Sequence, residues 1–118
     1  MAAFNLSSSI TSTSTYSISV SAYGASAYTL SGSDRNGSVS GNNATVTVNV
    51  SDTLNFVVNA SGHPFFIKTS ASTGTGNQVS TPAATNNGTQ SGTVSWTPNT
   101  AGTYYYICQY HGGMVGTI

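Results

Sequence analysis

Apolar and polar residues alternate along most of this 118-residue sequence, and this period of two constrains the fold more than any other feature. Between Tyr16 and Val20, for example, the apolar side chains are separated by serines. Successive side chains of a strand point to opposite faces, so the pattern predicts strands with one buried face. Similar alternation recurs at residues 28–30, 46–50, 54–58, 65–67, 94–96 and 104–108, and residues 115–118 can form a last strand. No stretch shows helical periodicity with caps, so we expect an all-β sandwich or barrel of seven or eight short strands.

Turn residues and composition divide the chain further. Residues 34–37 read Asp-Arg-Asn-Gly, which favours a tight reversal, and Pro98 with Gly102 brackets another. Residues 1–15 are mostly Ser and Thr, and we interpret them as an N-terminal arm that pairs with a neighbouring chain. Residues 16–118 then form the domain. Residues 69–91 are a long polar loop within it, of a kind that is usually functional or mobile.

Charge is nearly absent from the sequence. Only 3% of the residues are charged, against about a quarter in an average protein, and the formal net charge is zero. A chain without a basic patch is not expected to bind nucleic acid, and no apolar run of about 20 residues predicts a membrane span. We expect the few cations, including Arg35 and Lys68, to be solvated at the surface. The N-terminus lacks the features of a signal peptide, so we expect either that a leader has been replaced or that the protein is not secreted by that route.

The residues able to bind a soft metal ion are concentrated near the C-terminus. Cys108, His111 and Met114 occur within seven residues, and His63 is the remaining histidine of the chain. Two imidazoles and a thiolate, with a weak axial thioether, form the ligand set of a type 1 (blue) copper site. Cys108 would end a strand, and Gly112 and Gly113 would let the following loop return to the same metal. We therefore predict one mononuclear copper site.

Three other interpretations compete with copper. A lone buried cysteine normally acts as a small hydrophobe, so a degenerate site that holds no metal stays possible. An immunoglobulin-like sandwich also has a Tyr-x-Cys sequence near its end, but its disulfide needs a second cysteine. Cys108 and His111 could imitate a thiol nucleophile and its base, but no oxyanion motif accompanies them. We therefore predict that the protein is not an enzyme.

The segment from Gly102 to Met114, Gly-Thr-Tyr-Tyr-Tyr-Ile-Cys-Gln-Tyr-His-Gly-Gly-Met, resembles the copper-binding signature of the plastocyanin-like cupredoxins. Its short Cys-x-x-His-x-x-Met loop is similar to that of the amicyanin type. The resemblance covers roughly residues 25–118 and implies a Greek-key sandwich, with His63, Cys108 and His111 as equatorial copper ligands and Met114 as the axial ligand. Two positions depart from the family pattern. Ser51 stands where glycine is usual, and Pro64 replaces an asparagine whose hydrogen bond steadies the cysteine loop in many relatives.

A narrower resemblance, over Tyr28–Ile118, is to cupredoxin domains in virion structural proteins of cyanobacterial tailed phages. It implies a capsid-decorating or fibre-associated protein at the virion surface, bound to other virion subunits or to itself through residues 1–15. The alternative is a soluble blue-copper one-electron carrier that meets a redox protein in the periplasm or thylakoid lumen after loss of a leader. Tyr104, Tyr105 and Tyr106 suggest an electron path, but alternating burial with a tyrosine corner explains them better. We expect Trp96 in the core.

Overall fold

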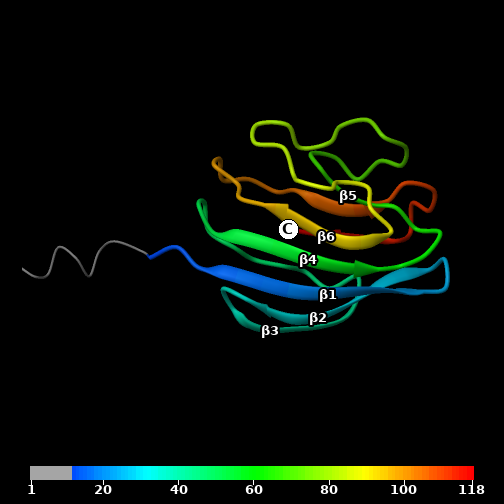
Figure 1. Ribbon diagram of the computed structural model, residues 1–118, viewed down its shortest axis with the longest axis horizontal. Helices are drawn as coiled ribbons and strands as arrows, with labels where there is room; N and C mark the ends of the chain where they lie inside the picture. Colours follow the sequence, from blue (N-terminus) through cyan, green and yellow to red (C-terminus); the bar gives the residue numbers. More distant parts are fainter. Residues whose placement is uncertain (1–11) are drawn as a thin grey trace, which may run out of the picture.

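The computed structural model describes residues 12–118, which form eight β-strands in two sheets (Figure 1). The five-stranded sheet has the order β3-β2-β1-β4-β6, and the three-stranded sheet has the order β5-β7-β8. The strands are β1 (Thr15–Tyr23), β2 (Ala27–Asp34), β3 (Gly37–Asn42), β4 (Thr53–Asn59), β5 (Phe65–Lys68), β6 (Ser91–Trp96), β7 (Tyr105–Cys108) and β8 (Val115–Thr117). β1 and β4 run parallel and the other pairs are antiparallel. The predicted all-β sandwich is confirmed.

The alternating pattern places the core between the sheets. In β1, Ile18 and Val20 are buried while Ser17, Ser19 and Ser21 are exposed. Ile18 pairs with Phe56 of β4, and Phe56 pairs with Val94 of β6, so equivalent faces of neighbouring strands carry the buried side chains. A one-residue slip of either pair would turn these side chains to solvent, so burial fixes the register.

An aromatic cluster fills the space between the two sheets. Phe65 is its centre, with ring centroids 5.1 Å from Tyr28, 4.9 Å from Phe56 and 5.5 Å from Tyr106. All four side chains are fully buried. Edge-to-face and offset contacts at these distances add to the stabilisation from burial itself.

Residues 46–50 do not form the strand that their alternation predicts. Val46 is buried, but Val50 is 42% exposed. The Val46 amide donates to Thr117 O, whereas the Thr47 amide donates to the Asp34 carboxylate, so side-chain and isolated backbone bonds replace a ladder. Conversely, β3 was not predicted, because Val39 is its only large apolar residue. Its hairpin with β2 closes at the predicted turn, where Asp34 pairs with Gly37.

Arg35 is not the solvated surface charge that the sequence suggested. Its guanidinium donates from Nε and Nη2 to both oxygens of Asp52, at 2.8 and 2.7 Å, and Asp52 is fully buried. It also donates to the carbonyl of Ser12, and Ser14 N donates to Asp52. Most of the predicted arm, residues 1–15, lies outside the described residues, but its last described part is hydrogen bonded to the domain at this ion pair.

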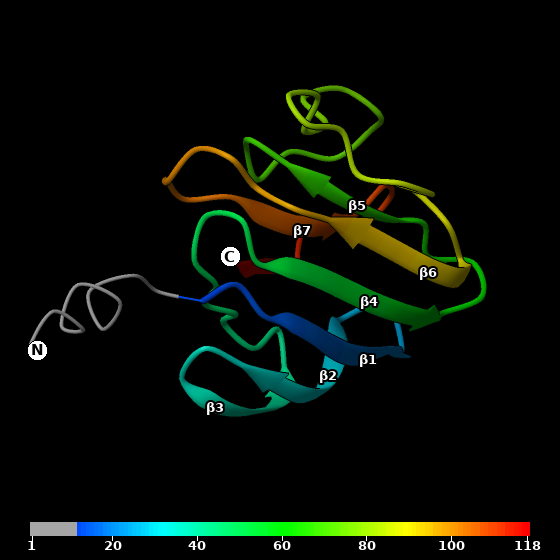
Figure 2. The ribbon, with the colours of Figure 1, turned by 60° about the vertical axis from the view of Figure 1, so that its left-hand side comes forward.

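The long polar segment between β5 and β6 lies along the outer side of β5 (Figure 2). Val79 N and the side chain of Asn87 hydrogen bond to the backbone of Ile67, so the segment occupies the free edge of β5. Gly88 approaches Phe66 so closely that a Cβ there would lie 2.5 Å from the ring. This cover buries Lys68 completely, so the predicted solvation of Lys68 is wrong.

The expectations for Trp96 and the tyrosine corner are confirmed. Trp96 is 3% exposed, its indole N–H donates to Pro82 O at 2.9 Å, and its ring packs edge-on against Tyr104. The Tyr104 hydroxyl donates to the carbonyl of Thr100, four residues upstream, as in a tyrosine corner. None of the described residues 12–118 belongs to a helix that could cross a membrane.

Candidate metal centre

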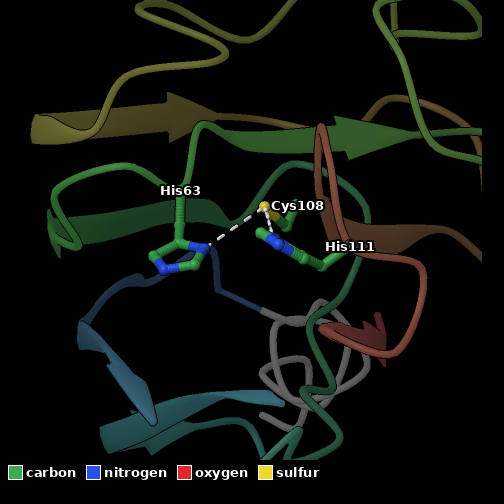
Figure 3. A group of neighbouring side chains, drawn as sticks. All are labelled: His63, Cys108 and His111. Atoms are coloured by element: carbon green, nitrogen blue, oxygen red, sulfur yellow. Dashed lines mark hydrogen bonds between the residues drawn. The ribbon is translucent and has the colours of Figure 1, made fainter. Parts of the chain in front are cut away.

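Three potential ligand atoms converge at one end of the sandwich. The Cys108 sulfur lies 3.7 Å from Nδ1 of His63 and 3.5 Å from Nδ1 of His111 (Figure 3). All three ligand atoms lie within 4.8 Å of one another, and the two imidazole centroids are 5.0 Å apart. The fold therefore brings His63 and Cys108, which are 45 residues apart in the sequence, into contact.

The spacing of these atoms fits one metal ion. Bonds of the lengths that zinc forms, about 2.0–2.1 Å to imidazole nitrogen and about 2.3 Å to thiolate, set at trigonal angles, would separate sulfur from nitrogen by about 3.8 Å. The observed separations of 3.7 and 3.5 Å need little adjustment to reach this arrangement. A thiolate with two imidazoles is also the donor set that copper prefers.

Strand pairing and one short loop place Cys108 and His111. Cys108 is the last residue of β7, pairs with Phe65 of β5 and is fully buried. Beyond it the chain reverses: Met114 N donates to His111 O at 3.1 Å, and Cys108 N donates to Met114 O at 3.0 Å. This closed backbone ring holds His111 beside the sulfur, as the Cys-x-x-His-x-x-Met spacing predicts.

His63 is placed by contacts that the sequence did not predict. Its amide donates to Ala60 O at 2.9 Å, in a turn that includes Gly62 at a φ of +84°. The Tyr28 hydroxyl, from the opposite sheet, donates to His63 O at 2.7 Å. Burial, assisted by the nearby Cys108, raises the pKa of Tyr28 well above its usual range, so the phenol stays a donor. In the sequence, Tyr28 is simply part of an alternating strand pattern. That pattern does not distinguish a tyrosine that fills the core from one that supports a site.

With proline at position 64, the cysteine loop is held by one backbone hydrogen bond on one side and by an asparagine side chain on the other. Gln109 N donates to Pro64 O at 3.0 Å, which ties the loop directly to the residue after His63. On the other side, the Asn43 amide group donates to Gly113 O at 3.0 Å. Asn43 also accepts from Tyr28 N, so one side chain links β2 to the metal loop. No feature of the sequence points to this role for Asn43.

Met114 lies at the end of the same loop and is fully buried. It belongs to the hydrophobic core together with Cys108, to which its carbonyl is hydrogen bonded. His63 and His111 keep partial exposure. The centre therefore has an apolar, water-poor side formed by the sandwich and a side open to solvent.

Comparison with known families agrees with this site. Residues 28–118 match the model of the copper-binding proteins of the plastocyanin/azurin family. The chain belongs to this family, the cupredoxins. The matched region of the cupredoxin contains all four predicted ligands, and copper is the cofactor of the family. The sequence matches none of the curated proteins.

Among solved structures, the cupredoxin is similar to the copper protein rusticyanin. The TM-score is 0.53 at 23% sequence identity, and the alignment covers 91% of this chain and 78% of rusticyanin. At that identity the likeness concerns the fold alone, and it supports the assignment of the two-sheet sandwich.

Proposed function

We propose that the protein is a one-electron carrier with a mononuclear type 1 copper site, in which His63, Cys108 and His111 are the equatorial ligands and Met114 is the axial ligand. The observation that carries the proposal is the convergence of one sulfur and two Nδ1 atoms within 4.8 Å on backbone that the sandwich already fixes. Copper bound there would cycle between Cu(II) and Cu(I).

The surrounding residues suit electron transfer because they resist rearrangement. Tyr28 fixes His63, Pro64 fixes Gln109, and Asn43 fixes Gly113, each through a hydrogen bond of 3.0 Å or less. Packed interiors transmit strain and deform little. A ligand set held from three sides changes little between oxidation states, which keeps the reorganisation cost of electron transfer low.

The face around His111 offers an uncharged docking surface. Tyr110, next to His111, is 63% exposed, and so is Tyr23 at the β1–β2 turn. That turn adjoins the loop, since a Cβ at Gly113 would lie 3.9 Å from Ser26 O. A partner redox protein with a similarly neutral, partly apolar face would bring its own centre close to His111.

Arg35, the most exposed charged side chain of the described residues, lies far from this face together with its buried partner Asp52. The Arg35–Asp52 pair lies beside the start of β1, and Tyr23 lies at its end. At a rise of about 3.3 Å per residue, the two ends of β1 are about 25 Å apart. This exceeds the Debye length of about 8 Å at physiological ionic strength. We therefore expect the rate of association with a redox partner to be nearly independent of salt.

The predicted absence of enzymatic activity is part of this proposal. Two hollows of about 690 and 260 Å³ indent the described surface. The larger is lined by residues 45–50, 100–104 and 117–118, and the smaller by residues near Trp96. Neither is lined by a predicted ligand, so neither would place a substrate against the metal.

The virion role predicted from the sequence is supported by no observation on the described residues. It depends on residues 1–15, which lie mostly outside them. That role, its virion partners and both predicted locations, the virion surface or the periplasm or thylakoid lumen, stay predictions.

Spectroscopy with redox titration tests the proposal. Copper-free protein should take up one equivalent of Cu(II), develop an intense visible thiolate-to-copper band and lose it reversibly on one-electron reduction. Cys108→Ser should abolish the band, because a hydroxyl does not replace a soft thiolate. Gln109→Ala changes the adjacent side chain and keeps the backbone bonds, so it should retain the band. A wild-type protein that binds copper without the band would refute the proposal.

A further inference from the structure

Lys68 is a buried cation without an obvious purpose in the site described above. It ends β5 and is inaccessible to solvent. Its ammonium group donates to Ser72 O at 2.8 Å and to Gly74 O at 2.7 Å. It also lies 5.6 Å from the centre of the Phe66 ring, within the range of a cation–π contact.

No carboxylate side chain balances this charge. The chain has two acidic residues. Asp52 is bound to Arg35, and Asp34 accepts from the amides of Asn36 and Thr47. Burial lowers the pKa of Lys68, which reflects the cost of removing the ammonium from water. An apolar side chain of similar length would fill this position at less cost, so stability alone does not account for the lysine.

The turn that Lys68 binds also touches the metal loop. Gly74 accepts from Lys68 through its carbonyl, and its amide donates to Gln109 O at 2.8 Å. Gln109 directly follows Cys108. On the same turn, the Thr73 methyl group would lie 3.7 Å from a Cβ at Gly112. A chain of hydrogen bonds thus runs from the ammonium through one glycine to the residue next to the predicted copper thiolate.

We propose that Lys68 is a positioning residue of the metal centre: its ammonium fixes the turn at residues 72–74, and this turn holds the loop from Cys108 to Met114. Charge-assisted hydrogen bonds are well suited to this, because they are stronger than neutral ones. The positive charge also favours the reduced, less positively charged centre, so it raises the reduction potential. Only this electrochemical consequence rests on the proposed electron-carrier function.

The first test uses copper-free protein, so it does not depend on the metal. Lys68→Met keeps the length of the side chain and removes the charge, and Thr75→Ala is a matched change at an exposed position of the same segment. Hydrogen exchange at the Gly74 amide should become at least about tenfold faster in Lys68→Met relative to that of core amides such as Phe56, since about 1.4 kcal/mol of local stabilisation corresponds to that factor. Thr75→Ala should leave the ratio unchanged.

The second test uses the copper-loaded protein. Lys68→Met should lower the reduction potential and shift the thiolate-to-copper band, while Thr75→Ala should change neither. If exchange accelerates equally at all amides and the potential is unchanged, Lys68 only supports the fold and the proposal is wrong. If the wild-type protein shows no thiolate-to-copper band, the carrier function fails, while the exchange result still decides the positioning role.

Should Lys68→Met fail to fold, the wild-type protein still gives a decision. The proposal requires the Gly74 amide to be as well protected as the amides of Cys108 and Met114, which close the metal loop. Rapid exchange at Gly74 in the folded wild-type protein would overturn it.

Discussion

Replacing Asp52 by asparagine should destabilise the domain and remove much of its sensitivity to acid. The Asp52 carboxylate accepts four hydrogen bonds: from Ser14 N and Arg35 Nη2 at Oδ1, and from Arg35 Nε and Asn49 N at Oδ2. Asparagine has nearly the same shape, but it is neutral and only one of its terminal atoms accepts. Two of the four donors would therefore face an amide NH₂ group.

The expected loss follows from these contacts. Removing one partner of a buried charge pair typically costs about 3–5 kcal/mol. The Arg35 side chain is 23% exposed and can regain water, so we expect a value near the lower limit, about 3 kcal/mol. That is a large part of the 5–15 kcal/mol that typically stabilises a domain.

The pH dependence has a definite sign. Arg35, with the amides of Asn49 and Ser14, holds the pKa of Asp52 well below its usual range. In the unfolded chain the group binds a proton near pH 4. Its stabilisation is therefore fully present at pH 7 and is lost progressively as the pH falls below about 4. Asp52→Asn has no such group, so the difference in stability between the two proteins should shrink on acidification.

Urea denaturation of copper-free protein, followed by Trp96 fluorescence, measures the free energy of unfolding of both proteins at pH 7 and pH 3. Asp34→Asn is the control, since Asp34 accepts two backbone amides but binds no arginine. Asp34→Asn should lower the free energy of unfolding by less, about 1–2 kcal/mol for one lost hydrogen bond. Equal stability of the wild-type protein and Asp52→Asn at pH 7, or a difference that does not shrink at pH 3, would refute the reasoning.

Three further changes test other parts of the molecule. Met114→Leu should keep the visible copper band and raise the reduction potential, because the axial bond is weak; loss of the band would contradict this. Ser51 has a φ of +76°, and Ser51→Gly should stabilise the domain by about 0.5–1 kcal/mol in thermal unfolding, because glycine removes the strain at some cost in entropy. Trp96→Ala should destabilise by about 3–5 kcal/mol in a copper-free protein that still unfolds cooperatively, since its ring fills the core. A copper-free wild-type protein that is unfolded at room temperature would contradict the last expectation.

The fold class and the identity of the candidate ligands could be read from the sequence because both depend on local patterns. The alternation around Ile18 and Val20 reflects the two faces of a strand, whatever the strand packs against. The Cys-x-x-His-x-x-Met spacing closes one tight loop, so residues adjacent in sequence also meet in space.

Contacts between distant segments were not predictable in this way. His63 reaches the loop through pairing of β5 with β7, and the site is supported by Tyr28 from β2 and by Asn43 from the turn after β3. Nothing in the sequence near Tyr28 or Asn43 distinguishes them from other strand or turn residues. Residues 46–50 show the converse, because they have the alternating pattern of a strand but form none. Their backbone amides instead donate to the Asp34 side chain and to isolated carbonyl groups.

The sequence by itself determined the strand period, the scarcity of charge and the presence of a soft ligand set in the order that the copper-binding family uses. Only the tertiary structure decided which charged side chains are exposed to water and which are buried. Arg35 binds a buried carboxylate, and Lys68 is enclosed by a loop that looks merely polar in the sequence. The physical reason is that the environment of a charge is set by the segments that cover it, and those segments arrive from elsewhere in the chain.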